Sequence, residues 1–189
     1  SPDDSRIATG SFDGVVITAW GTNSDGSRFA SKGDMFSATP WNETMFADAL
    51  ADLKATHPTK ATENFLMLWS LPHTVDWFDD AGWAIITEKF RIMARLAKQG
   101  GLRGILFDSE NYSEKSKAWR FLAQTNRAQH GFADYFGKVR QRGQETMRAM
   151  AGEFPDLTVF GYWLMSVNLR ALDPSGSLAS LQAEEYGLL

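Results

Sequence analysis

Cysteine is absent from this chain of 189 residues, and histidine occurs only three times. The lack of cysteine excludes disulfide bonds, thiolate metal sites and a cysteine nucleophile. No run of about 18 apolar residues is present, so the sequence shows no membrane-spanning helix. Acidic residues outnumber basic ones by 23 to 19, and nucleic-acid partners usually require a basic excess. We therefore expect neither nucleic acid nor a membrane as a partner.

Two common catalytic motifs are also missing. No glycine-rich run leads from a strand into a helix with the lysine of a phosphate-binding loop, and no nucleophile-elbow motif supports Ser-His-Asp catalysis. No cofactor is implied. The lack of disulfides does not fix the compartment, because many periplasmic proteins also lack them; we favour a secreted or periplasmic location. The oligomeric state stays open.

Four strand-like runs alternate with four helical patterns along the chain. The predicted strands cover residues 15–20, 65–70, 105–107 and 157–163, and the predicted helices cover about 45–53, 84–96, 132–150 and 178–186. Residues 21–39 lack a periodic apolar pattern and predict a long loop. This alternation predicts a parallel sheet with right-handed crossovers.

The number of units bears on the fold class. A closed eight-stranded barrel typically needs about 250 residues, whereas this chain offers four βα units. It is therefore either a small open α/β sheet or the N-terminal half of a (β/α) TIM-type barrel, and we favour the incompletely represented barrel. Residues 1–189 are expected to form a single domain, because no internal linker is visible. The hydrophobic content of 43% fits one such domain.

The candidate site follows the third predicted strand. Gly100 and Gly101 can end the preceding helix, because glycine takes the left-handed C-cap conformation without steric cost. The buried run at 105–107 then leads directly into two carboxylates, Asp108 and Glu110. Parallel α/β sheets and barrels present catalytic groups at such strand ends.

The two carboxylates suggest acid catalysis. If the strand stays regular to its end, Asp108 and Glu110 share one face. Two like charges at such a short distance shift each other's pKa values in opposite directions, so one group can stay protonated while the other is ionised. Glycoside hydrolysis uses such a pair to protonate the leaving oxygen. We predict Glu110 as the general acid and Asp108 as its stabiliser or partner.

Aromatic residues end the other predicted strands and suggest a carbohydrate as the substrate. These residues are Trp20, Trp69, Tyr162 and Trp163. If they converge at one sheet edge, their rings form a platform for sugar rings, and Asn111 and Tyr112 can bind a sugar or orient the carboxylates. The competing interpretation is a solvated turn beside aromatics that belong to the core.

Two further functions stay open. The first is a non-catalytic carbohydrate-binding domain that uses the same aromatic platform. The second is a magnesium-dependent enzyme in which Asp108 and Glu110 supply hard oxygen ligands. No other metal site is predicted.

The stretch Gly104-Ile105-Leu106-Phe107-Asp108-Ser109-Glu110-Asn111-Tyr112 resembles the strand-end motif of family 18 chitinase-like hydrolases and their endoglucosaminidase relatives. The resemblance implies that Glu110 is the general acid and that Asp108 holds the N-acetyl group of the substrate, which acts as the nucleophile. Arg103 and Leu106 stand where that family usually carries further aspartates. More broadly, residues 12–16, 75–80 and 104–112 resemble an uncharacterised group of bacterial proteins that are glycosidase-like by fold.

Overall fold

The computed structural model describes residues 12–56, 61–110, 112, 117–162, 168 and 178–189. Asn111 and Trp163, two predicted substrate-binding residues, lie outside this set. The strands are β1 (Val16–Ile17), β2 (Trp20–Thr22), β3 (Arg28–Ala30), β4 (Phe65–Trp69), β5 (Gly104–Asp108) and β6 (Thr158–Gly161). The α-helices are α2 (Ala47–Ala55), α3 (Asp80–Gln99) and α4 (Phe132–Glu153). Short 3₁₀ helices are η1 (Ser31–Gly33), η2 (Glu43–Phe46), η3 (Phe121–Ala123) and η5 (Leu178–Ala183).

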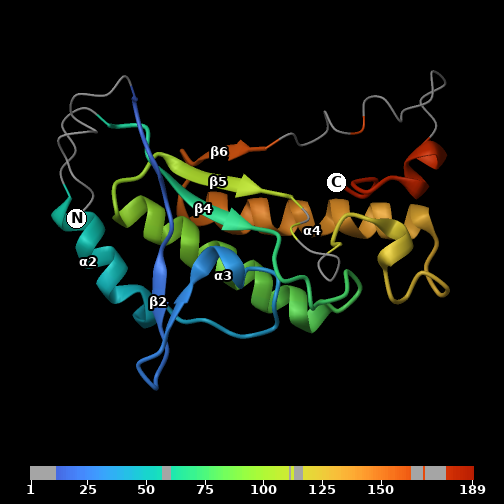
Figure 1. Cartoon of the computed structure of the whole chain (residues 1–189), viewed down its shortest axis with the longest axis horizontal. Helices are drawn as coiled ribbons and strands as arrows, with labels where there is room; N and C mark the ends of the chain where they lie inside the picture. The colour runs from blue at the N-terminus through green and yellow to red at the C-terminus, as the bar shows by residue number, and fades with distance from the viewer. Residues whose placement is uncertain (1–11, 57–60, 111, 113–116, 163–167, 169–177) are drawn as a thin grey trace.

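A four-stranded parallel sheet with the order β1-β4-β5-β6 lies at the centre of the fold. Within this sheet each strand pairs with the one that follows it along the chain, and in Figure 1 both α3 and α4 lie behind the sheet. Right-handed crossovers repeated in one direction give this sequential order and leave the helices on one face. The predicted parallel sheet with alternating helices is confirmed. The sheet is open over the described residues, with β1 and β6 at its edges, so a closed barrel remains a prediction.

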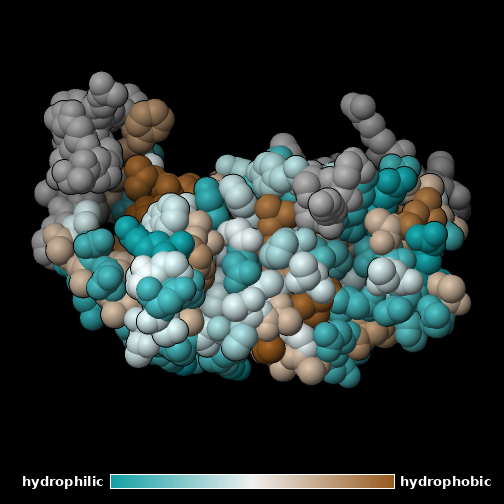
Figure 2. Space-filling model, turned by 60° about the horizontal axis from the view of Figure 1, so that its bottom comes forward, coloured by the Kyte–Doolittle hydropathy of each residue, from teal (hydrophilic) through white to brown (hydrophobic). Residues whose placement is uncertain are grey.

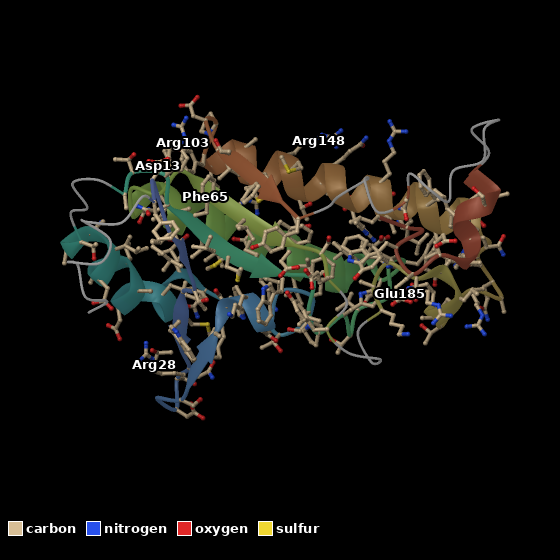
Figure 3. All side chains as sticks on the ribbon, turned by 45° about the horizontal axis from the view of Figure 1, so that its top comes forward. Asp13, Arg28, Phe65, Arg103, Arg148 and Glu185 are labelled. Atoms are coloured by element: carbon tan, nitrogen blue, oxygen red, sulfur yellow. The ribbon has the colours of Figure 1, made fainter. Side chains whose placement is uncertain are left out.

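The strand β4 has one face in the core and one outside it. Leu66 and Leu68 are fully buried in the core, whereas Phe65, Met67 and Trp69 alternate with them and are half-buried on the opposite face. Figure 3 places Phe65 at the start of the strands. The C-terminal edge of the sheet, where a site is expected, lies toward the other end of the molecule.

We call the face opposite α3 and α4 the open face, and it carries apolar side chains. Strand register places Val16 beside Phe65 and Phe160 beside Leu106 on this face. Val16 is 44% exposed and Phe160 is 51% exposed, because each lies on an edge strand. In Figure 2 this face is turned upward, and hydrophobic side chains gather toward the upper left of the view.

Two glycines shape the entry into β5. Gly101 has φ +71°, and the next N–H, of Leu102, donates to the carbonyl oxygen of Ala97 at 2.9 Å. This Schellman arrangement ends α3 as the double glycine predicts. A Cβ on Gly104 would lie only 1.9 Å from the carbonyl oxygen of Thr158, so glycine at this position lets β6 approach β5.

Most tryptophans of the chain belong to the core. Trp41, Trp77, Trp83 and Trp119 are all buried. The rings of Trp77 and Trp83 stack with their centroids 4.7 Å apart, where the start of α3 meets the loop after β4. These four form part of the core, and Trp20 and Trp69 are the described tryptophans that are not buried.

The predicted first strand at 15–20 is wrong as one element. β1 ends at Ile17, and Trp20 instead begins β2, which pairs with β3 as an antiparallel hairpin. The turn is made by Gly26, at φ +83°, whose N–H donates to the carbonyl oxygen of Asn23. The predicted loop at 21–39 therefore contains a hairpin and η1. The predicted helix at 178–186 is the shorter 3₁₀ helix η5.

A buried lysine ties the segment after this hairpin to α3. The ammonium of Lys89 donates to the backbone oxygen of Asp34 at 2.6 Å, to its Oδ2 at 3.1 Å and to Oγ of Ser37 at 2.8 Å. It also lies 4.6 Å from the ring centroid of Trp41. Burial lowers the pKa of Lys89, and the charge of Asp34 opposes that shift. These contacts fix the segment that follows η1.

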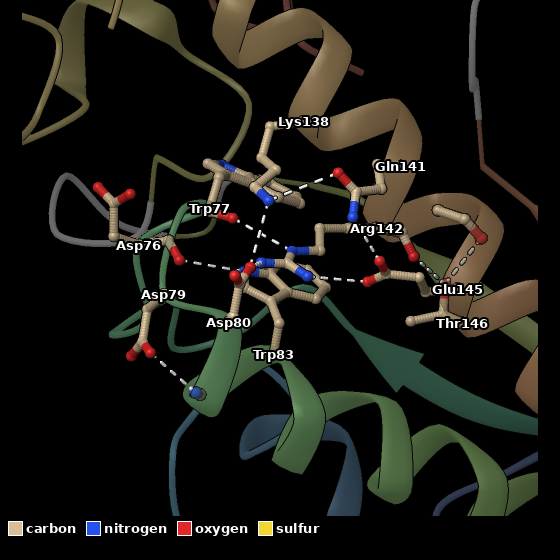
Figure 4. A network of polar contacts seen from close by, with 12 residues as sticks. Asp76, Trp77, Asp79, Asp80, Trp83, Lys138, Gln141, Arg142, Glu145 and Thr146 are labelled. Carbon is tan, nitrogen blue, oxygen red and sulfur yellow. Dashed lines mark hydrogen bonds and ion pairs between the residues drawn. The ribbon is translucent and has the colours of Figure 1, made fainter. Parts of the chain in front are cut away.

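A second buried cation holds the loop after β4. Arg142 of α4 donates from Nε to the backbone oxygen of Trp77 at 3.2 Å, and its guanidinium pairs with Asp80 and Glu145 (Figure 4). The guanidinium carbon lies 5.6 Å from the ring centroid of Trp83. Arginine suits this position because its planar group combines several directed hydrogen bonds with a ring contact. The starting turn of α3, α4 and the loop are thus joined.

Replacing Lys89 by methionine is expected to lower the free energy of unfolding by about 2–3 kcal/mol at neutral pH, because buried oxygens lose their donor. Because the pKa of Lys89 is lowered in the folded protein, the unfolded chain keeps this proton to higher pH than the folded chain does. The contribution of this group to the free energy of unfolding of the wild type therefore rises as the pH approaches 10.5. Urea unfolding at several pH values should show the difference between the proteins widening in alkali. Lys54→Met, on the exposed side of α2, is the matched control; an equal effect there would contradict the prediction.

Candidate functional site

The ends of two central strands bring the first site residues together. Trp69, the last residue of β4, is in register with Asp108, the last residue of β5, and both lie on the open face. The N–H of Ser70 donates to the backbone oxygen of Asp108 at 3.1 Å, which continues the pairing one residue further. The carboxyl ends of parallel strands meet at one edge, as is usual for sites of α/β proteins.

Asp108 is a buried carboxylate whose two oxygens both accept hydrogen bonds. It is only 1% exposed. Its Oδ1 accepts from the N–H of Glu110 at 3.0 Å, and its Oδ2 accepts from the hydroxyl of Tyr112. Two accepting oxygens are the pattern of an ionised carboxylate. Asp108 therefore organises the turn after β5.

Glu110 is the more accessible of the two carboxylates. β5 ends at Asp108, and the chain then turns through the Asp108–Glu110 hydrogen bond instead of continuing as a regular strand. The condition for both carboxylates to share a strand face is therefore not met. Glu110 is partly exposed, and its charge acts on the hydroxyl of Tyr112.

Tyr112 connects the carboxylates to an aromatic pair. Its ring centroid lies 5.0 Å from that of Trp69, at an interplanar angle of 39°. Although the residue as a whole is half-exposed, desolvation of its hydroxyl raises the pKa of Tyr112. The hydrogen bond to Asp108 and the charges of Asp108 and Glu110 raise this pKa further, with a smaller contribution from Tyr162.

The structure brings one of the other predicted aromatic residues to this edge and places another elsewhere. Tyr162 follows β6, donates its N–H to the carbonyl oxygen of Phe107 at 3.2 Å, and is close enough to Tyr112 to influence its ionisation. The structure therefore brings Tyr162 to the same edge as Trp69. Trp20 is different, because it lies on the hairpin strand β2 and not at the end of a strand of the parallel sheet. The positions of Asn111 and Trp163 fall outside the described residues.

Sequence reasoning missed Lys32. This residue of η1 places its ammonium 4.1 Å from the ring centroid of Trp69. It belongs to the segment predicted as a loop without pattern, and a lone lysine there carries no signal of its own. The indole nitrogen of Trp69 and Oγ of Ser109 are also buried without a hydrogen-bond partner among the described residues. Each is thus a buried polar group that no described residue satisfies.

Surface hollows occur elsewhere on the chain. One of about 350 Å³ is lined by residues of the hairpin turn and the start of η2, including Asn23 and Asn42. Another of about 550 Å³ lies between α4 and η5 and includes Phe132 and Arg140. Neither is lined by Asp108 or the groups around it.

Metal and membrane sites can be assessed over the described part of the chain. There, no three side chains of His, Cys, Asp or Glu gather into a group that could hold a metal ion. Each oxygen of Asp108 accepts one hydrogen bond within the chain, and Glu110 is the more exposed carboxylate of the two. Every helix in the same set of residues is too short or too polar to cross a membrane.

Comparison of the chain with protein-family models, with curated proteins and with solved structures finds no match. The family resemblance of the strand-end motif therefore stays a prediction. The properties of the site follow from its own geometry.

Replacing Asp108 by asparagine is expected to lower the pKa of Tyr112 toward the usual tyrosine value of 10.0, because the negative charge beside its hydroxyl is removed. Burial of the hydroxyl remains, so the shift is partial. Titration of the four tyrosines by ultraviolet absorbance should show one step moving to lower pH. Asp108→Asn combined with Tyr112→Phe should lack this step, and an unchanged titration of the single variant would contradict the described contact.

Proposed function

We propose that the chain binds a carbohydrate at the C-terminal edge of its parallel sheet and hydrolyses an O-glycosidic bond, with Glu110 as the general acid. The observation that carries this proposal is the contrast between two carboxylates two residues apart. Asp108 is buried and doubly hydrogen-bonded, whereas Glu110 is partly exposed beside it. Glycosidases use two carboxyl groups with different roles, one that donates a proton and one that stays ionised.

The contacts of Asp108 define its part in the reaction. Its carboxylate orients Glu110 through the backbone N–H and holds Tyr112 through the phenolic hydroxyl. As a fixed negative charge, it stabilises the positive charge that develops on a sugar ring in the transition state. Glu110 protonates the oxygen of the leaving sugar as the glycosidic bond breaks, and a water molecule then adds to the anomeric carbon and returns a proton to Glu110. Asp108 is thus a stabilising partner, and Glu110 transfers the proton.

The aromatic residues supply the binding surface in this proposal. Trp69 and Tyr112 present adjoining rings next to the carboxylates, and Tyr162 comes from the neighbouring strand. Rings of this kind bury the apolar faces of sugars. Trp20 is a more distant contact on the hairpin.

We extend the proposal to the fold. The sequential strand order, with α3 and α4 on one face and an apolar opposite face, is the arrangement of one side of a (β/α) barrel of TIM type. In such a barrel the C-terminal edge of the strands carries the active site. This is the edge at which Trp69, Asp108 and Tyr162 lie.

A non-catalytic carbohydrate-binding domain is the second candidate. It is favoured by the same ring pair, Trp69 and Tyr112, which needs no proton transfer to bind a sugar. The role of one residue, Glu110, distinguishes the two candidate functions. In a binding domain Glu110 contributes at most a hydrogen bond, whereas in a hydrolase its proton is indispensable.

Glu110→Gln is expected to lower kcat on natural glycosides by roughly 10²–10⁴-fold, the usual contribution of a general acid, with little change in affinity. Aryl glycosides with a strongly acidic leaving group need no protonation, so the variant should retain activity on them. Steady-state kinetics on both substrate types, with Glu184→Gln as an exposed control, provide the measurement.

Equal losses on both substrate types would contradict the role of Glu110 as an acid. Sugar binding without hydrolysis by the wild type, lost in Trp69→Ala, would instead support the binding domain.

A further inference from the structure

Lys32 lies over the ring of Trp69, on which a sugar is expected to stack. Its ammonium lies 4.1 Å from the centroid of Trp69, and Trp69 is the register neighbour of Asp108. Among the described residues Lys32 takes part in no ion pair, although many other lysines and arginines of the chain do. Its charge is therefore neutralised by no side chain of the described structure.

The position of Lys32 is fixed by the fold. It lies two residues before Asp34, which is held by the buried Lys89, and η1 packs beside β4. The anchored segment therefore keeps the backbone of Lys32 beside β4, within reach of Trp69.

This arrangement treats neutral and anionic sugars differently. A neutral ring that stacks on Trp69 displaces the ammonium, which then loses its contact with the ring and gains no charged partner. An anionic group on the sugar draws the ammonium toward itself and forms a charge-assisted hydrogen bond, which is stronger than the contact it replaces.

The hairpin carries a second pair of the same kind. The guanidinium of Arg28 lies 5.5 Å from the ring centroid of Trp20, and Arg28 is likewise in no ion pair among the described residues. Figure 3 shows Arg28 on the hairpin, away from the sheet. Two cations, each above a tryptophan, thus belong to one segment of a chain whose net charge is −4.

We propose, on the basis of the function proposed above, that the carbohydrate bound at this edge carries an anionic substituent, a carboxylate or a sulfate ester, which Lys32 recognises beside Trp69. Lys32 acts in binding and takes no part in the proton transfer by Glu110. The substrate class is therefore acidic polysaccharide and not neutral glucan or unmodified chitin.

The experiment compares matched pairs of oligosaccharides on an array. Each uronate-containing oligosaccharide is printed beside its carboxyl-reduced form, and each sulfated one beside its desulfated form. Wild type, Lys32→Met, Lys32→Arg and Lys54→Met are applied, and the best pair is then measured by titration calorimetry at low and high salt. Carboxyl and sulfate pairs distinguish the two sources of negative charge.

The wild type is expected to bind the anionic member of a pair at least tenfold more tightly than its neutral twin, with the preference weakened by salt. Lys32→Met should reduce that preference to less than twofold, whereas Lys32→Arg and Lys54→Met should retain it. Equal binding of both twins by the wild type, or an undiminished preference in Lys32→Met, overturns this inference and leaves the proposed function standing. Binding of no oligosaccharide overturns both.

Discussion

The ion pair between Lys89 and Asp34 is the contact on which the arrangement of the site depends most. It joins a segment with little secondary structure of its own to the longest buried helix face of the fold. Placing an ammonium out of water costs several kcal/mol, and only a complete set of acceptors offsets that cost. Asp34 and Ser37 supply acceptors that offset part of this cost, and they do so in one position of the segment relative to α3. The hairpin and Lys32 then follow from chain connectivity.

The second constraint is the one-sided covering of the sheet. Because α3 and α4 share a face, the core forms between them and one side of the strands, and residues on the other side remain available. Asp108 is buried although it lies on that other side, since the turn after β5 folds back over it through Tyr112. The same short segment thereby shields one carboxylate and leaves Glu110 accessible. A difference in exposure between neighbouring acids arises here from local chain geometry.

The sequence predicted the parallel sheet, the positions of β4, β5 and β6, and the long helices, because these depend on periodicity and on helix-ending residues such as Gly100 and Gly101. It also predicted which strand ends in the carboxylates. The hairpin was missed, since β2 and β3 are three residues each and too short for a pattern to show. Lys32 could not be found at all, because its meaning comes from a tertiary contact with Trp69, 37 positions away. Asp108 and Glu110 were expected on one strand face because side chains alternate along a strand. The hydrogen bond from the N–H of Glu110 to Asp108 instead turns the chain where the strand ends.

The edge strands of the sheet carry backbone groups and apolar side chains that a further strand could cover. β1 and β6 are last in the described sheet, and Val16 and Phe160 stand exposed beside their backbone groups. An edge strand with apolar neighbours is a template for a further strand from any source, because pairing satisfies the backbone and covers the side chains in one step. A further strand along β6 would therefore satisfy its outer backbone groups and cover Phe160 in the same step.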